Sequence, residues 1–300
     1  MACAGMSQAL EQWTAAMRGR RYDAAWDIAD ASLGERDPAM RDDPSQPYHL
    51  RWVWDGTDVS GRDVLVRCYH GLGDTIQFAR FLPLLAERAR SVTVEVQSRL
   101  IDLLATVPGI DRIVAFDPAR PLPASECTVE ITELDHVLRA SPADLAAPYM
   151  SASRAVLPAG TIGLCHAAGD WDPSRSVPAT ALAPVCDLAP CLTLVAEATD
   201  LPVLNPAGCP FDMGATASLV AGASLVITVD TMIAHLAGAF GRAVWLLLKA
   251  EPDWRWAPDQ VTSDWYPTMR LYVQQRPGDW SGVVDRVVGD LAEWRPTAEA

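Results

Sequence analysis

The chain has 300 residues, of which 50% are hydrophobic and 21% are charged, so it can form two globular domains of ordinary size or one large one. Its formal charge of −14 argues against a nucleic-acid partner, which needs a basic face to displace counterions. No apolar run approaches the ~20 residues of a membrane-spanning helix, and residues 1–25 carry too many charges for a secretory signal. We therefore expect a cytoplasmic protein without a transmembrane segment.

The N-terminal part is expected to be helical. Residues 6–34 carry an apolar stripe of helical period that is interrupted near Gly19, which predicts a helical hairpin. Segment 19–26 resembles one unit of a tetratricopeptide repeat, and a single unit must pack on the body of the protein to bury its apolar face. Residues 35–62 are rich in Asp, Pro and Trp, so residues 1–62 are expected to be a hairpin with a connecting segment.

Strands and helices then alternate in a first block. Pro83 lies within the first of the helices and should kink it, because proline removes one helical hydrogen bond. The strands are expected at residues 63–69, 91–96, 112–116 and 127–131, and the helices at 75–90 and 98–106.

A second block of alternating elements follows a segment rich in Pro and Gly at residues 141–160. Its strands are expected at residues 161–166, 192–196, 202–204, 225–229, 243–248 and 270–274, and its helices at 215–223 and 279–294. Two such blocks predict an α/β fold with two parallel sheets, in domains 63–155 and 156–300, closed by helix 279–294. Ligands of these sheets bind beyond the carboxyl ends of the strands.

The first candidate motif is the segment 70–75, His-Gly-Leu-Gly-Asp-Thr, which follows a strand. Gly71 and Gly73 permit a tight turn and close approach of a ligand to the backbone, next to Thr75. Asp74 lies at the start of a helix, where two interpretations stay open. It could cap the helix, or its carboxylate could take a proton from a sugar hydroxyl.

The second candidate motif, Asp230-Thr-Met-Ile-Ala-His235, follows the strand 225–229 and opens a helix. The Thr231 hydroxyl and the amides of Thr231, Met232 and Ile233 could bind a diphosphate, because helical N–H groups attract anions. His235 could donate a further hydrogen bond. The alternative is that Thr231 caps the helix and His235 is hydrogen-bonded inside the fold.

A third candidate is the loop 166–178, which follows the first strand of the second block. Arg175, beside Ser176, presents paired donors that suit a phosphate. Lys249 follows the strand 243–248 and could join it. Tryptophans gather at residues 254–256 and 265–266, where aromatic rings could stack on a sugar or, as the alternative, pack in the interior.

Residues 67–83 and 229–245 resemble the two motifs of glycosyltransferase family 9, the heptosyltransferase-like enzymes. The first reads Arg-Cys-Tyr-His-Gly-Leu-Gly-Asp-Thr-Ile-Gln-Phe-Ala-Arg-Phe-Leu-Pro, and the second Val-Asp-Thr-Met-Ile-Ala-His-Leu-Ala-Gly-Ala-Phe-Gly-Arg-Ala-Val-Trp. The resemblance covers roughly residues 63–290 and is strongest to the branch that carries tetratricopeptide repeats. It implies a GT-B fold of two Rossmann-like domains, with an interdomain cleft between an acceptor and a donor domain.

The resemblance also implies a function. It implies inverting, metal-independent transfer of a sugar from a nucleotide-diphosphate donor to a glycan, lipid-linked or protein acceptor, with no cofactor. Asp74 matches the catalytic base, and Asp230, Thr231 and His235 match the donor-phosphate motif. The loop 166–178 departs from the family by its acidic Asp170 and Asp172. This departure keeps open a binding protein without turnover; a sugar-nucleotide epimerase lacks a convincing acid/base pair.

Overall fold

The computed structural model describes residues 2–295, which form two compact units. The first unit combines the chain up to Ala146 with Trp254–Trp256, and the second holds Ala147–Asp253 and the chain from Ala257 onward. The division thus lies before the boundary expected after residue 155, and the N-terminal hairpin belongs to the first unit. The segment 254–256 is part of the first unit although the residues on either side of it belong to the second.

The N-terminal hairpin consists of α1 (Ala2–Arg18) and α2 (Tyr22–Gly34), as predicted. Trp26 on α2 is buried. Asp30 on α2 forms an ion pair with His136, whose Nε2 lies 2.7 Å from Asp30 Oδ1. On α1, the ring of Trp13 lies 4.7 Å from that of Trp254. The expected packing of the hairpin on the body of its unit is confirmed by these contacts.

The sheet of the first unit has four parallel strands in the order β3-β2-β1-β4. Leu65 in the central strand pairs with Thr93 on one side and with Thr128 on the other. The strands are β1 (Asp63–Arg67), β2 (Ser91–Val96), β3 (Arg112–Ala115) and β4 (Cys127–Glu130). All four were expected. Buried parallel strands such as β1 read as short runs of apolar and β-branched residues, and the more exposed β3 still carries Ile113 and Val114.

The helix expected at 75–90 is wrong in its start and its continuity. It begins three residues earlier as α3 (Leu72–Phe78), and a 3₁₀ turn, η3 (Ala79–Phe81), separates it from α4 (Leu82–Ala86). Pro83 therefore lies in the first turn of α4, where no helical partner for its missing N–H is needed, and the predicted helix is interrupted directly before it. The unit is completed by η1 (Pro38–Met40), η2 (Tyr48–Leu50), η4 (Ser98–Leu100), α5 (Ile101–Leu104), η5 (Ile131–Glu133) and α6 (Leu134–Leu138).

The sheet of the second unit has five parallel strands in the order β6-β5-β7-β8-β9. They are β5 (Ile162–Cys165), β6 (Cys191–Thr193), β7 (Leu225–Val229), β8 (Val244–Leu248) and β9 (Met269–Val273). The strand expected at 202–204 is wrong. Pro202 has no N–H to donate, and of this segment Leu204 N reaches a strand, donating to Cys191 O at 2.8 Å.

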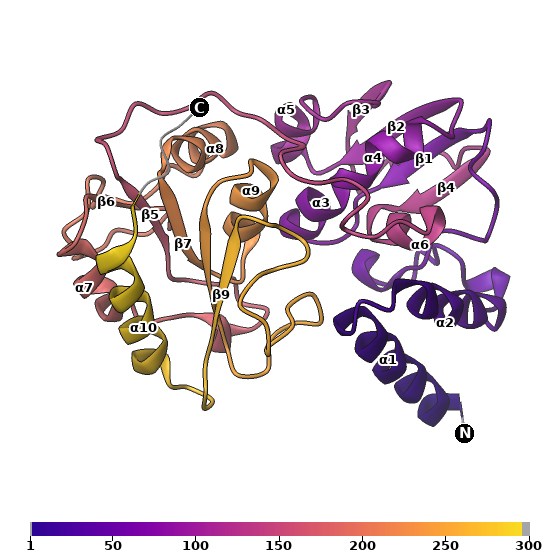
Figure 1. Cartoon of the computed structure of the whole chain (residues 1–300). Coiled ribbons are helices and arrows are strands. Elements are labelled where there is room, and N and C mark those ends of the chain that lie inside the picture. Colours follow the sequence, from indigo (N-terminus) through magenta and orange to yellow (C-terminus); the bar gives the residue numbers. More distant parts are fainter. Residues whose placement is uncertain (1, 296–300) are drawn as a thin grey trace. The chain divides into compact units, whose positions relative to one another are not determined.

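Helices lie on both sides of this second sheet (Figure 1). Alternate residues of β7, such as Ile227 and Val229, share a buried cluster with Trp280 and Val284 of α10. Figure 1 shows α10 and α7 on one side of the sheet, with α8 and α9 on the other. The bounds are η6 (Pro173–Arg175), η7 (Ala179–Leu182), α7 (Ala183–Cys186), α8 (Met213–Gly222), α9 (Met232–Ala239) and α10 (Trp280–Glu293).

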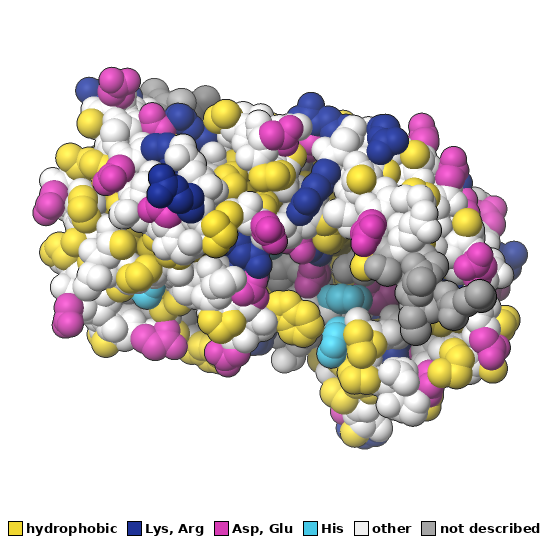
Figure 2. All heavy atoms as spheres, turned by 90° about the horizontal axis from the view of Figure 1, so that it is seen from below, with side chains coloured by type: hydrophobic (Ala, Val, Ile, Leu, Met, Phe, Trp, Pro, Cys, Tyr) yellow, Lys and Arg dark blue, Asp and Glu magenta, His cyan; other side chains and the backbone are white. Residues whose placement is uncertain are grey.

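Two further observations concern the surface. Acidic and basic side chains are interspersed over the face shown in Figure 2. Within residues 2–295, none of the helices has the length and apolar character needed to cross a bilayer.

Candidate functional site

Asp74 lies in the first turn of α3, directly beyond the carboxyl end of β1. Gly71 is the capping residue, and Asp74 Oδ2 accepts a hydrogen bond of 3.1 Å from Gly71 N. Asp74 is therefore not the capping residue, as one interpretation expected, but the third residue of the helix, and it stabilises the helix start through this hydrogen bond. Its side chain is nevertheless 28% exposed, so part of the carboxylate is open to solvent. Stabilisation of the helix start and proton transfer are therefore compatible at this position.

The neighbours of Asp74 stabilise the turn between β1 and α3. Thr75 is fully buried and donates a hydrogen bond of 3.2 Å to Gln97 Oε1, so this hydroxyl stabilises the fold. Gly73 is half-buried within α3. A Cβ at Gly71 would lie 3.1 Å from Asp74 Oδ2, which favours glycine at the cap.

Sequence reasoning gave no role to His70, yet it lies beside Asp74. His70 Nδ1 is 3.1 Å from Glu130 Oε1 at the carboxyl end of β4. Burial lowers the pKa of His70, but the carboxylates of Glu130 and Asp74 outweigh it, so the pKa is raised. Glu130 is buried, and its Oε1 also accepts from Tyr69 N at 3.0 Å. His70 is thus a second titratable group at the same strand edge.

Arg255 is the principal residue that sequence reasoning missed in the first unit. Its guanidinium forms an ion pair of 2.5 Å with Asp74 Oδ1. Arg255 also interacts electrostatically with Asp135 in the first turn of α6. Burial raises the pKa of Asp135 to about 7, and the positive charge of Arg255 opposes that rise. Asp74 and Arg255 are 181 positions apart, so no local pattern links them.

In the second unit, α9 begins at the carboxyl end of β7. Thr231 is the capping residue, and its hydroxyl accepts a hydrogen bond of 3.1 Å from Ile233 N. Met232 is half-buried, whereas Ile233 is buried. Thr231 therefore caps the helix, as the alternative interpretation of this motif expects, and its hydroxyl occupies the amide of Ile233. Binding of a diphosphate by the first amides of α9 stays a prediction.

The loop after β5 reaches the same edge. Arg175 donates a hydrogen bond of 2.8 Å from a terminal nitrogen to Asp230 O. The Ser176 hydroxyl accepts from Ala168 N at 2.9 Å and so closes the loop on itself. Arg175 is half-buried, so its guanidinium is fixed beside the start of α9.

Asp172 in this loop binds Lys249, which follows β8. Their charged atoms lie 2.6 Å apart. Hydrogen bonds from Lys249 and Ser174 lower the pKa of Asp172 to about 2, so the carboxylate is ionised. The structure thus brings together, at the carboxyl ends of β5, β7 and β8, the predicted residues Arg175, Ser176, Asp230, Thr231 and Lys249.

His235 lies in the interior, four residues after Thr231. It is 6% exposed, and its Nδ1 lies 3.1 Å from the hydroxyl of Tyr266, which is fully buried. A hydrogen-bonded interior histidine is what the alternative interpretation of this motif expects. A contact of His235 with a donor phosphate stays a prediction.

Two of the tryptophans in these segments pack in the interior, whereas Trp254 is half-buried. Trp256 in the first unit is 0% exposed, and Trp265 in the second is 3% exposed. These rings are enclosed by protein, so the packing alternative is confirmed for both.

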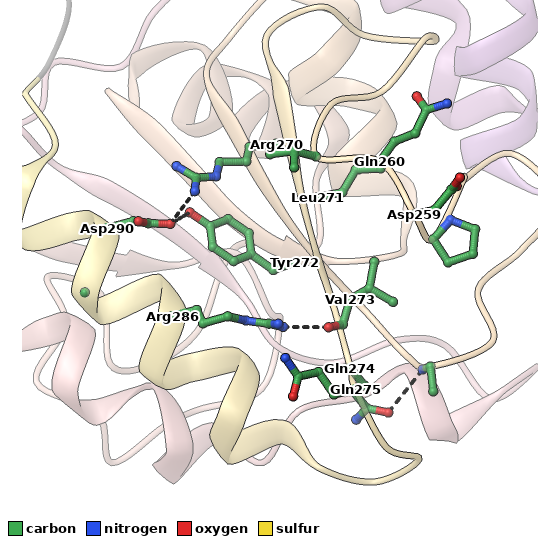
Figure 3. Close-up of a pocket in the computed structure, with 14 residues that line it drawn as sticks. Asp259, Gln260, Arg270, Leu271, Tyr272, Val273, Gln274, Gln275, Arg286 and Asp290 are labelled. Carbon is green, nitrogen blue, oxygen red and sulfur yellow. Dashed lines mark hydrogen bonds and ion pairs between the residues drawn. The ribbon is translucent and has the colours of Figure 1, made fainter.

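A cavity of about 710 Å³ lies along β9 and α10 (Figure 3). Figure 3 shows Arg270 beside Asp290, 2.7 Å apart, and Arg286 directed at the carbonyl of Val273. None of the residues predicted to bind a donor lines this cavity. It is therefore separate from the edge at which Arg175 and Thr231 meet.

Comparison with known proteins identifies the fold of the chain. No protein-family model matches the chain. Protein FlbA of Caulobacter vibrioides is 23% identical over 323 aligned positions, which cover 91% of this chain and 53% of that protein. The chain therefore spans about half the length of this curated relative.

Two solved structures are similar over most of the chain. A glycosyltransferase of family 9 from Veillonella parvula matches 79% of this chain and 97% of its own, with a TM-score of 0.57 and 13% identity. The chain has the fold of these glycosyltransferases. The dodecameric iron-containing heptosyltransferase TibC of Escherichia coli, in complex with ADP-D-β-D-heptose, matches 79% of this chain and 78% of its own, with a TM-score of 0.58 and 13% identity. The expected α/β fold with two parallel sheets is thereby confirmed.

Proposed function

We propose that this protein is an inverting glycosyltransferase that moves a sugar from a nucleotide-diphosphate donor to an acceptor hydroxyl, without a metal ion. The observation that carries the proposal is the meeting of Arg175, Thr231 and the first amides of α9 at one edge of the second sheet. These groups attract a diphosphate, and the structure of TibC with ADP-D-β-D-heptose shows a neighbour that binds such a donor.

In this proposal the second unit binds the donor. As the bond between the anomeric carbon and the phosphate oxygen breaks, the nucleoside diphosphate leaves with the electron pair. The guanidinium of Arg175 and the amides at the start of α9 stabilise the negative charge that develops. Lys249 would help to stabilise this charge only if its ion pair with Asp172 were broken.

Asp74 of the first unit is the general base. The acceptor oxygen attacks the anomeric carbon from the side opposite the diphosphate, which inverts its configuration, and its proton passes to the Asp74 carboxylate. The partial exposure of Asp74 allows an acceptor to approach it. The acceptor is a glycan, a lipid-linked saccharide or a protein. The N-terminal hairpin of α1 and α2 supports a place in the branch with tetratricopeptide repeats.

A second candidate function is nucleotide-sugar binding without turnover. Two ion pairs favour it, because Arg255 occupies one oxygen of Asp74 and Asp172 neutralises Lys249. Both groups would then serve the fold, and the site would bind a donor without activating an acceptor.

A ligand screen followed by an assay separates the candidates. ADP, UDP, GDP and ADP-D-β-D-heptose are added in a thermal-unfolding experiment, where a ligand at 100 times its Kd stabilises the native state by about 2.7 kcal/mol. We expect a nucleoside diphosphate to raise the melting temperature of the wild type and not that of Arg175→Ala. Arg112→Ala, on an exposed residue of β3, is the control.

Donors that bind are then incubated with glycan, lipid-linked and protein acceptors. Formation of a glycosylated product supports the transferase. Binding without any product supports the second candidate, and the lack of stabilisation by every nucleotide would contradict both.

A further inference from the structure

We infer that Arg255 is the positioning residue of Asp74, which holds the proposed base in one orientation from a segment far along the chain. The inference rests on the proposed transferase function and names a residue to which neither the motifs nor the comparisons assign a role. Arg255, Asp74 and their contacts all belong to the first unit.

The guanidinium of Arg255 spans one turn of α3. Its terminal nitrogen lies 2.5 Å from Asp74 Oδ1, and its Nε donates a hydrogen bond of 2.6 Å to Gln77 Oε1. Asp74 and Gln77 are three residues apart and therefore lie on the same helix face. A planar guanidinium held at two points cannot rotate without breaking a contact, so its orientation fixes that of the carboxylate.

The two oxygens of Asp74 are held by different groups. Oδ1 is bound by Arg255, and Oδ2 accepts from Gly71 N at 3.1 Å. Each carboxylate oxygen has a second lone pair, and the side chain is 28% exposed, so a proton can still be accepted from an incoming hydroxyl. The contacts thus restrict the rotation of the carboxylate while leaving it accessible to the acceptor.

Arg255 is itself fixed by aromatic packing. Its side chain is 14% exposed, and the ring of Trp254 lies 4.7 Å from its guanidinium carbon. The ring of Trp254 meets that of Trp13 on α1 edge-on at 4.7 Å, and the adjacent Trp256 is fully buried. Contacts therefore run without interruption from the N-terminal hairpin through Trp254 and Arg255 to the carboxylate of Asp74.

A half-buried guanidinium loses hydration, and an ion pair with a carboxylate offsets part of that cost. Here the strongest contact is made to a carboxylate that stays partly open to solvent, in the turn that the sequence motif marks. An error of about 1 Å in the position of a reacting group can reduce turnover about 100-fold, so fixing this carboxylate has a large kinetic effect.

The test measures ADP release from ADP-D-β-D-heptose, with water or with the acceptors of the screen, for the wild type, Arg255→Ala and Arg255→Lys. We expect Arg255→Ala to lower kcat by roughly 100-fold while the Kd for ADP and the KM for the donor change less than about twofold. Methylguanidinium added to Arg255→Ala should restore at least about a tenth of kcat, because it supplies the missing planar group of N–H donors. Arg255→Lys keeps the positive charge but not the planar group of N–H donors, so its kcat should stay well below that of the wild type.

Arg90→Ala is the matched control, because Arg90 also pairs with an aspartate of the first unit, at 2.6 Å from Asp63, but is exposed. It should keep wild-type kcat. The double variant Asp74→Asn with Arg255→Ala should lose no more activity than Asp74→Asn, because the arginine acts through that carboxylate.

The outcomes are distinguishable. A wild type that releases no nucleoside diphosphate from any donor that binds in the screen would overturn the transferase and this inference together. An active wild type with an equally active Arg255→Ala would overturn the inference alone. So would a loss of kcat in Arg255→Ala that methylguanidinium fails to restore, since the residue would then be needed only for folding.

Discussion

Lys249 Nζ lies 2.6 Å from Asp172 Oδ2, so the loop after β5 neutralises the lysine that follows β8. Both side chains are about one third exposed, at 27% and 31%. An ion pair at such a position contributes little to stability, about 0–1 kcal/mol. Its main effect is on the charge that an incoming diphosphate meets, because the acidic loop cancels one of the cations at the edge of the second sheet.

The first prediction is that Asp172→Asn strengthens ADP binding. The change removes one negative charge and breaks the ion pair of Lys249, so the lysine can interact with the diphosphate. An added interaction of about 1 kcal/mol between these charges corresponds to a roughly fivefold lower Kd. Isothermal titration calorimetry measures the Kd. Asp170→Asn removes an equal charge from an exposed position of the same loop and should change the Kd less than twofold. An unchanged Kd in Asp172→Asn would exclude Lys249 from the donor site.

The Asp172 ion pair also has a pH dependence. Because the pKa is lowered from 3.8 to about 2, the pair is intact at neutral pH and is lost only as the pH falls toward 2. The Asp172 carboxylate should therefore be ionised and paired with Lys249 at both pH 5 and pH 8.

The second prediction is that Asp74→Asn abolishes sugar transfer and preserves ADP binding and the fold. The amide cannot accept the proton, and the loss of a general base lowers turnover by about 10²–10⁴-fold. Asparagine can still accept the hydrogen bond from Gly71 N, so the circular dichroism spectrum should not change. Asp102→Asn, at an exposed position in the first turn of α5, is the control and should remain active. Full activity of Asp74→Asn would remove this residue from the mechanism.

The third prediction concerns Gly238 in α9. A Cβ at this position would lie 2.4 Å from the ring of Tyr266, which hydrogen-bonds His235. Gly238→Ala should therefore destabilise the protein by about 1–3 kcal/mol, the usual effect of overpacking. At Gly289 in α10 nothing lies within 4 Å, so Gly289→Ala should instead stabilise it by about 0.5–1 kcal/mol. Urea unfolding measures both, and equal effects of the two changes would contradict the packing described for Tyr266.

The fourth prediction is that Asp135→Asn stabilises the protein at alkaline pH. Burial raises the pKa of Asp135 from 3.8 to about 7, so the native state holds a proton that the unfolded state releases between these values. The wild type should lose stability through this group as the pH rises from about 4 to about 7. The variant should gain up to about 4 kcal/mol over the wild type at pH 8 and little at pH 4.

Urea unfolding of both proteins at the two pH values tests this expectation. The difference between variant and wild type is the informative quantity, because it cancels the titration of all other groups. A difference that is the same at pH 4 and pH 8 would show that Asp135 is not buried in its acidic form.

Sequence patterns predicted the strands better than the helices. Residues 225–229 were assigned correctly because a strand buried on both faces is a continuous run of apolar and β-branched residues. The start of α3 was misplaced because Gly71 and Gly73 suggest a turn, whereas the helix begins directly after Gly71, whose N–H is bonded by the Asp74 carboxylate. Short elements such as α6 span too few residues to show a helical period.

The candidate site was predictable only where it is local in sequence. Thr231 could be located because it directly follows a strand and opens a helix. Arg175 and Lys249 could be assigned to the same edge because the carboxyl ends of parallel strands coincide. The partners Arg255 of Asp74 and Tyr266 of His235 could not be inferred, since tertiary packing alone brings them together.

The inclusion of Trp256 in the first unit has a practical consequence for dissecting the chain. A fragment that stops at Ala146 would lack Trp254–Trp256, and one that starts at Ala147 would carry these residues without the unit to which they belong. We therefore expect a single cut between the units to destabilise the N-terminal piece. Supplying Trp254–Trp256 to that piece, as a grafted tail or an added peptide, should restore its stability.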